Sequence, residues 1–95
     1  MTGNKKVLIL PGDGIGPEVC DEAKKVLNQI NLSHNLDISI QESEVGGIAY
    51  ENFGKPLPDK TLSLARDADA ILLGAVGGPA WDNLDYDLRP ERALL

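Results

Sequence analysis

The sequence predicts an α/β fold with three layers, in which helices cover both faces of a largely parallel sheet. Two continuous apolar runs, at residues 7–10 and 70–73, suit strands that are buried on both faces. Each run passes into a glycine-rich turn, and apolar residues at helical spacing lie between the two runs. Strands that alternate with amphipathic helices are typical of parallel sheets.

The first apolar run leads into the glycine-rich stretch LPGDGIGPE at residues 10–18. Pro11 is expected to end the strand, and Pro17 suits the first turn of a helix. The glycines allow positive φ or a close approach to a ligand, and free N–H groups at the helix start can bind an anion. The spacing is G-x-G-x-G and not the Rossmann pattern G-x-G-x-x-G, and Glu42 and Glu44 lie too late to be its ribose-binding acid. A tight turn without a ligand remains the alternative.

The elements between the two apolar runs are predicted from the spacing of apolar residues. A sheet-covering helix is expected to carry an apolar stripe at Val19, Cys20, Ala23, Val26, Leu27 and Ile30. Cys20 lies on this stripe and is therefore predicted to be a core residue and not a reactive thiol. The other predicted elements are a polar turn at 31–35, a strand near the sheet edge at 36–41, a short helical turn at 48–53 and a helix at 59–67.

The three strands are expected in the order 2-1-3. Crossovers between parallel strands are right-handed, and the alternating pattern at 36–41 suits a peripheral strand. The chain then reverses direction between the first and third strands, and ligands bind outside the carboxyl ends of the strands at such a switch point. Both glycine-rich turns, at 12–16 and 74–79, would border this crevice. The spacing therefore predicts an anionic or nucleotide-like ligand there without naming it.

The composition argues against several classes of protein. The 95 residues, of which 42% are apolar, fall within the size range of one domain. The net charge of −6 and the absence of a basic stripe argue against a nucleic-acid surface. The polar stretch 1–6 does not resemble a signal peptide, and no apolar run is long enough for a membrane span. A single cysteine excludes an internal disulfide and is compatible with a reducing cytosol.

The composition changes after Pro79. Residues 80–88 contain the only Trp and three Asp, and they suit either a solvated linker held by an aromatic staple or a segment that covers a ligand. Residues 89–95 are predicted to begin a helix, inside which the sequence stops. Three strands with two crossover helices leave open sheet edges. Residues 1–95 are therefore expected to be the amino-terminal part of a larger α/β domain.

Several motifs occur in order along the whole chain. They are LPGDGIGPE at 10–18, Gly46-Gly47, PLP at 56–58, ADAILLGAVGGP at 68–79, Trp81-Asp82 and Arg89-Pro-Glu91 followed by Leu94-Leu95. Together they resemble the amino-terminal portion of the isocitrate/isopropylmalate dehydrogenase family. The Arg-Pro-Glu and Leu-Leu pairing is similar to the isopropylmalate branch of that family.

The resemblance implies an activity and its cofactors. It implies NAD-dependent oxidative decarboxylation of 3-isopropylmalate in leucine biosynthesis by a cytoplasmic homodimer that uses Mg²⁺ or Mn²⁺. The arginines, tyrosine, lysine and metal-binding aspartates of such enzymes match no position up to Leu95, so no catalytic residue and no metal ligand is assigned here, and this segment alone is expected to be inactive. The alternatives are a related decarboxylating dehydrogenase for homoisocitrate, tartrate or malate, and a self-standing α/β binding module without catalysis.

The resemblance also implies site residues. The cofactor-binding set is Ile15, near the adenosine, and Gly78, Pro79, Ala80, Trp81, Asp82, Asn83, Leu84, Asp85, Tyr86, Asp87, Leu88, Arg89, Pro90 and Glu91 along the cofactor. The substrate-binding set is Glu91, Leu94 and Leu95, which an α-helical start would project from one face. Ala80 replaces a usual lysine, and Arg92-Ala93 replaces a pair that usually ends in glycine. The acidic run Asp82, Asp85 and Asp87 is expected to be a solvated loop and not a metal site.

Overall fold

The computed structural model describes residues 4–95, so the first three residues of the polar stretch 1–6 lie outside the described part. A parallel sheet is formed by β1 (Lys5–Gly12), β2 (Ile38–Glu42) and β3 (Ala70–Ala75), in the predicted order β2-β1-β3. The helices are α1 (Gly16–His34), α2 (Gly47–Phe53) and α3 (Asp59–Asp67). Three 3₁₀ turns follow β3, namely η1 (Pro79–Trp81), η2 (Tyr86–Leu88) and η3 (Pro90–Leu94).

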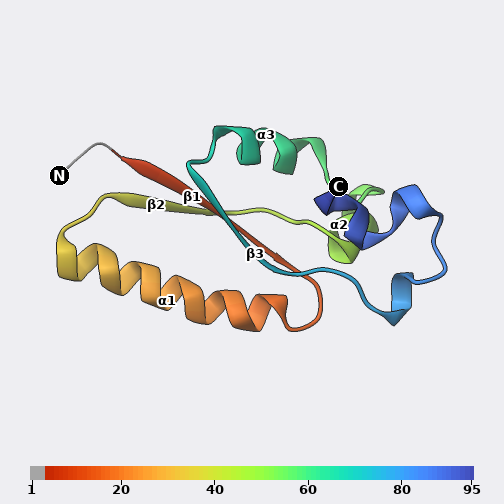
Figure 1. Ribbon diagram of the computed structural model, residues 1–95, viewed down its shortest axis with the longest axis horizontal. Coiled ribbons are helices and arrows are strands. Elements are labelled where there is room, and N and C mark those ends of the chain that lie inside the picture. Colours follow the sequence, from red (N-terminus) through yellow and green to blue (C-terminus); the bar gives the residue numbers. More distant parts are fainter. Residues whose placement is uncertain (1–3) are drawn as a thin grey trace.

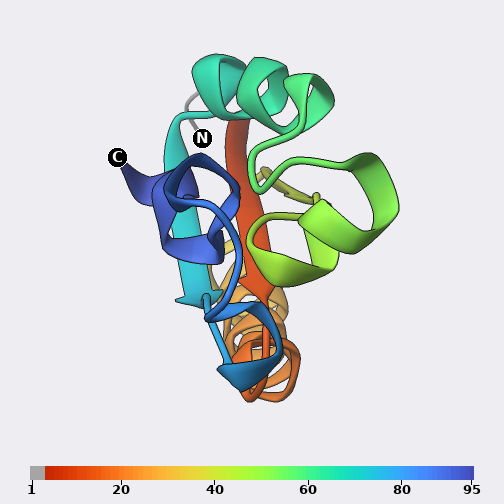
Figure 2. The same cartoon turned by 90° about the vertical axis from the view of Figure 1, so that its right-hand side faces the viewer.

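The predicted three-layer arrangement is confirmed for the described residues. Helix α1 lies against one face of the sheet and α3 against the other, while α2 and the 3₁₀ turns gather at the carboxyl ends of the strands (Figure 1). In Figure 2, α3 lies at the top and α1 at the bottom, with β1 and β3 between them, and α2 lies to the right of β1. No helix among these residues is long and apolar enough to cross a membrane.

The two faces of β1 build two parts of the core. Leu8 and Leu10 are buried together with Val45, and the partly buried residues packed against them are Leu57, Leu64, Ala65, Ala68, Val76 and Ala93. Ile9 alternates with the two leucines and is buried on the α1 side. Cys20 of α1 is buried as predicted, and this burial raises the pKa of its thiol. The cysteine is therefore a core residue held in its unreactive form.

Three predicted boundaries are wrong. The strand expected at 36–41 covers Ile38–Glu42, because Leu36 N–H donates to the carbonyl of Asn31 at the end of α1 and so lies outside the ladder. Strand β1 continues through Pro11 to Gly12, because β2 stops pairing with β1 at Ile9, and so the missing N–H of Pro11 costs no ladder bond. Helix α1 continues through the polar stretch 31–35 as far as His34. The Asn31 side chain bonds both the N–H and the carbonyl of Ile38, which ties the last helical turns to β2.

One apolar surface is only partly covered. The stripe predicted on α1 faces the sheet at Cys20, whereas Val26 on the same stripe is exposed. A groove of about 460 Å³ runs between α1 and the sheet and is lined by Val7, Ala23, Val26, Leu27, Ala70, Ile71 and Leu72. Within residues 4–95, β3 pairs only with β1, so its other edge is open, as the sequence predicted.

An ion pair connects β1 to the end of α3 and makes stability depend on pH. Lys6 Nζ lies 2.8 Å from Asp67 Oδ2, and this hydrogen bond lowers the pKa of the Asp67 carboxyl below 3.8. A lowered pKa in the folded state adds stability that is present above the unfolded pKa and is lost as the pH falls through the folded value. Asp67→Asn is expected to lower the free energy of unfolding slightly at pH 7, because both groups are exposed.

The difference between Asp67→Asn and the parent protein should then shrink as the pH falls below 3.8. Urea unfolding of both proteins at pH 7, 5 and 3 measures it, and a difference that stays constant over this range would contradict the role assigned to the pair.

Candidate functional site

The two glycine-rich turns meet at the carboxyl ends of β1 and β3. The N–H of Asp13, in the first turn, donates to the carbonyl of Ala75 at 2.7 Å, where the second turn begins. Gly16, at the start of α1, also packs against this strand end, because an added Cβ there would lie 3.0 Å from the nitrogen of Ala75. The predicted juxtaposition of the turns is therefore confirmed.

Asp13 is the polar centre of this region. Asp13 is 3% exposed, and its carboxylate accepts three backbone hydrogen bonds. The N–H groups of Gly47 and Gly77 donate to Oδ2 at 2.7 and 2.9 Å, and the N–H of Ile48 donates to Oδ1 at 2.8 Å. The sequence pattern predicts a role for the glycines on either side of Asp13 and not for Asp13 itself. The signal that could have found it is an acidic residue between two glycines, directly after a buried strand.

Trp81 fastens the segment after β3 to α2. A Cβ built at Gly47 would overlap the indole ring, and one built at Gly78 would lie 3.1 Å from Cζ3 of the same ring. The ring therefore lies against the bare Cα atoms of two glycines. This contact matches the aromatic-staple interpretation of Trp81 and places the start of the Gly78–Glu91 segment beside α2.

The middle of that segment is exposed and held by local contacts. Arg89 Nε donates to the carbonyl of Leu84 at 3.0 Å, and the Arg92 guanidinium lies 5.0 Å from the centre of the Tyr86 ring. The acidic side chains of the run at 82, 85 and 87 are all exposed. Residues 4–95 contain no group of three His, Cys, Asp or Glu side chains that could hold a metal ion.

The predicted α-helical start at the end of the chain is wrong, because η3 is a 3₁₀ turn that ends at Leu94. Residues three apart eclipse in this geometry, so Glu91 and Leu94 share a side. Glu91 and Leu95 line a small hollow of about 180 Å³ together with Tyr86, Arg89 and Arg92. The Glu91 carboxylate also lies next to Gly77, since an added Cβ there would be 3.1 Å from Oε2.

Ile15 is the remaining predicted cofactor residue. It occupies the N-cap position of α1, and its side chain is 67% exposed. The structure places Glu91 next to Gly77, whose N–H donates to the Asp13 carboxylate. Ile15 lies in the first glycine-rich turn, with an exposed side chain.

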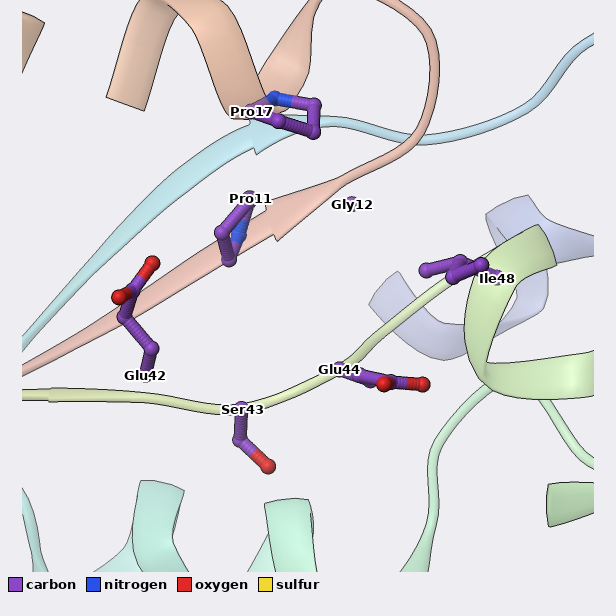
Figure 3. Close-up of a pocket in the computed structure, with 7 residues that line it drawn as sticks. All are labelled: Pro11, Gly12, Pro17, Glu42, Ser43, Glu44 and Ile48. Atoms are coloured by element: carbon purple, nitrogen blue, oxygen red, sulfur yellow. The ribbon is translucent and has the colours of Figure 1, made fainter. Parts of the chain in front are cut away.

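A second hollow lies between the carboxyl ends of β1 and β2 (Figure 3). It measures about 370 Å³ and is lined by Pro11, Gly12, Pro17, Glu42, Ser43, Glu44 and Ile48. Both carboxylates at its rim have partners, because Lys24 Nζ lies 3.0 Å from Glu42 and Asn52 donates to Glu44 at 2.8 Å. The bond to Glu42 raises the pKa of Lys24, so this lysine stays charged.

Comparison with known proteins gives one family. A family model described as isocitrate/isopropylmalate dehydrogenase matches residues 6–95. The chain is 59% identical over 92 residues to proteins named 3-isopropylmalate dehydrogenase from Xylella fastidiosa and Xanthomonas campestris, covering 97% of the chain and 26% of each relative. A protein of the same name from Pseudomonas fluorescens is 54% identical over the same shares. The chain thus spans about a quarter of the length of these relatives.

Two solved structures resemble the fold. Isocitrate dehydrogenase from Methylococcus capsulatus matches with a TM-score of 0.69 and 33% identity, over 86% of this chain and 22% of that one. A beta-decarboxylating dehydrogenase from Thermococcus kodakarensis, in its apo form, matches with a TM-score of 0.67 and 35% identity, over 79% and 21%.

Proposed function

The chain belongs to the isocitrate/isopropylmalate dehydrogenase family, and from this premise we propose that it is the amino-terminal part of the cofactor-binding domain of an NAD-dependent enzyme. The reaction is the oxidative decarboxylation of 3-isopropylmalate to 4-methyl-2-oxopentanoate, in leucine biosynthesis. The 59% identity to proteins named for this substrate supports the choice over other family members. A cytoplasmic homodimer, as the resemblance implies, is part of the same proposal.

The observation that carries this proposal is the meeting of the two glycine turns with Glu91 beside them. The turns lie at the switch point of the sheet, where α/β proteins bind ligands. Ile15 would contact the adenosine, and the Gly78–Glu91 segment would lie along the cofactor. The Glu91 carboxylate would face the nicotinamide, whose positive charge in NAD⁺ it attracts. Leu94 and Leu95 would contact the isopropyl group.

The residues present indicate which parts of the reaction this chain could serve and which must come from the rest of the enzyme. When bound, NAD supplies the acceptor for the hydride that leaves the substrate. An exposed apolar side chain at Ile15 and an exposed carboxylate at Glu91 fit the two ends of this cofactor. The described residues do not fit Mg²⁺ or Mn²⁺, which need several oxygen ligands together. We therefore assign the metal ligands and the acid and base to polypeptide outside this chain.

A related decarboxylating dehydrogenase is the second candidate, because a solved isocitrate dehydrogenase shares 33% identity and the fold. The test is a full-length protein that contains this chain, assayed for NADH production with NAD and Mg²⁺ or Mn²⁺. We expect the highest kcat/KM with 3-isopropylmalate and loss of turnover with a chelator. Higher kcat/KM with isocitrate, homoisocitrate, tartrate or malate would select the second candidate. Binding of NAD without turnover of any of these substrates would instead indicate a binding module without catalysis.

The placement of Ile15 gives a separate prediction. In the full-length protein, Ile15→Asp is expected to raise the dissociation constant for NAD about tenfold or more, because a carboxylate would be desolvated against the adenosine and would repel the phosphates. Leu32→Asp is the matched control, since Leu32 is an exposed apolar residue near the far end of α1. Isothermal titration calorimetry measures both constants. Equal constants for the two variants would show that Ile15 does not contact the cofactor.

A further inference from the structure

The Gly77–Glu91 region is attached to the rest of the fold near its two ends, at Gly77 and Trp81 and, at the far end, through the buried Pro90. It follows β3 as short 3₁₀ turns whose backbone hydrogen bonds are local, such as Leu88 N–H to the Asp85 carbonyl at 2.9 Å. Such turns are poor at holding a long segment in one place, since each spans only a few residues. The bond from Gly77 N–H to Asp13 and the Trp81 contact attach the start of the region to the rest of the fold.

Asp13 is itself held rigidly. Its N–H donates to Ala75 at 2.7 Å, and its carbonyl accepts from Gly16 N–H at 2.9 Å. The described residues provide no Lys, Arg or His within ion-pair distance of its carboxylate. All three partners of the carboxylate are backbone N–H groups, and two of them, at Gly47 and Ile48, belong to the first turn of α2, which has no side-chain cap of its own.

The same carboxylate therefore joins three segments that are distant in sequence. It lies in the first glycine turn, caps α2 and holds Gly77, against which the Glu91 carboxylate lies. We propose that Asp13 is a positioning residue for cofactor binding. It fixes the position of the second glycine turn and, through that turn, of the Gly78–Glu91 segment. This inference rests on the proposed NAD site. It predicts that changing Asp13 weakens NAD binding without Asp13 touching the cofactor.

Thr61 supplies a matched control. It is also a buried polar residue, and its Oγ1 lies 2.7 Å from both the Glu44 carbonyl and Ser43 Oγ. It therefore secures the connection between β2 and α2 but has no bond to Gly77. Thr61→Val removes these bonds at nearly constant volume. Asp13→Asn likewise keeps the shape, but an amide has one acceptor oxygen and places its NH₂ group against at least one backbone donor.

The experiment uses the full-length protein and its Asp13→Asn and Thr61→Val variants. Both variants are expected to melt at lower temperature. Asp13→Asn should also raise the dissociation constant for NAD about tenfold, which is about 1.4 kcal/mol, and speed hydrogen exchange in peptides covering 76–91. Thr61→Val should change the NAD constant less than about twofold and speed exchange only around 43–48. An unchanged NAD constant in a folded Asp13→Asn protein would overturn the proposal.

Two further outcomes are distinguishable. A wild-type protein that binds no NAD refutes the proposed function, while exchange at 76–91 still decides whether Asp13 holds this segment. If Asp13→Asn does not fold, the wild-type protein decides instead, because the Gly77 amide is then expected to be as protected from exchange as that of Gly47. Exchange of Gly77 at the rate of a free loop amide would overturn the proposal.

Discussion

Gly12→Ala is expected to lower the free energy of unfolding by about 3–5 kcal/mol, which is the largest effect on stability that we predict. Gly12 has a φ of 74°, which costs an alanine about 1–2 kcal/mol. A Cβ at this position would also overlap the carbonyl oxygen of Ala75. That oxygen belongs to the backbone and accepts the Asp13 N–H, so it cannot move without breaking the contact between the two glycine turns.

Gly14→Ala is the matched control for this prediction. Gly14 also has a positive φ, of 57°, but an added Cβ would meet no atom within 4 Å. Gly14→Ala should therefore lower the free energy of unfolding only through the strained positive φ, by about 1–2 kcal/mol. Denaturant unfolding of both variants measures the difference, provided that the slope with denaturant is unchanged. Equal losses would show that the close approach of the turns is not what requires glycine at position 12.

The elements that the sequence predicted well are those with a local signal. The apolar run at 70–73 forms a strand, and the strand order follows from the handedness of crossovers, both as predicted. The predicted burial of this run on both faces is wrong for residues 4–95, because Ile71 and Leu73 are 51% and 37% exposed on a strand that no further element covers. The short helix at 48–53 and the helix at 59–67 were likewise predicted from proline, glycine and apolar spacing. The meeting of the glycine turns followed from the topology and not from any single residue.

The features that were missed depend on contacts between distant residues. The bonds of Asp13 reach residues 34, 35 and 64 positions along the chain, and the sequence contains no local pattern for them. The helical extension through 31–34 depends in the same way on the bonds between Asn31 and Ile38. The change from α to 3₁₀ geometry at η3 is also invisible, because proline at the first turn suits either helix.

Under the proposed function, the preference for a branched substrate depends on Leu94 and Leu95. Leu94→Ala and Leu95→Ala are each expected to cut the preference for 3-isopropylmalate over unbranched malate by about 10- to 200-fold, mainly by lowering kcat/KM for the branched substrate. Leu94 shares a side of η3 with Glu91, and Leu95 lines a hollow with it. A carboxylate and two apolar side chains would then surround the alkyl group.

The competing explanation is that both leucines only pack η3 against the core. Within residues 4–95 they show no such packing, because they are 55% and 82% exposed, whereas Ala93, which precedes Leu94, packs against the core cluster. Leu32→Ala is the control, because Leu32 is 80% exposed and lies on α1. We expect all three variants to keep their melting temperature and only those at 94 and 95 to lose the substrate ratio. If Leu94→Ala and Leu95→Ala melted early with the ratio of kcat/KM values intact, these leucines would be structural, and the isopropyl group would have to be bound elsewhere.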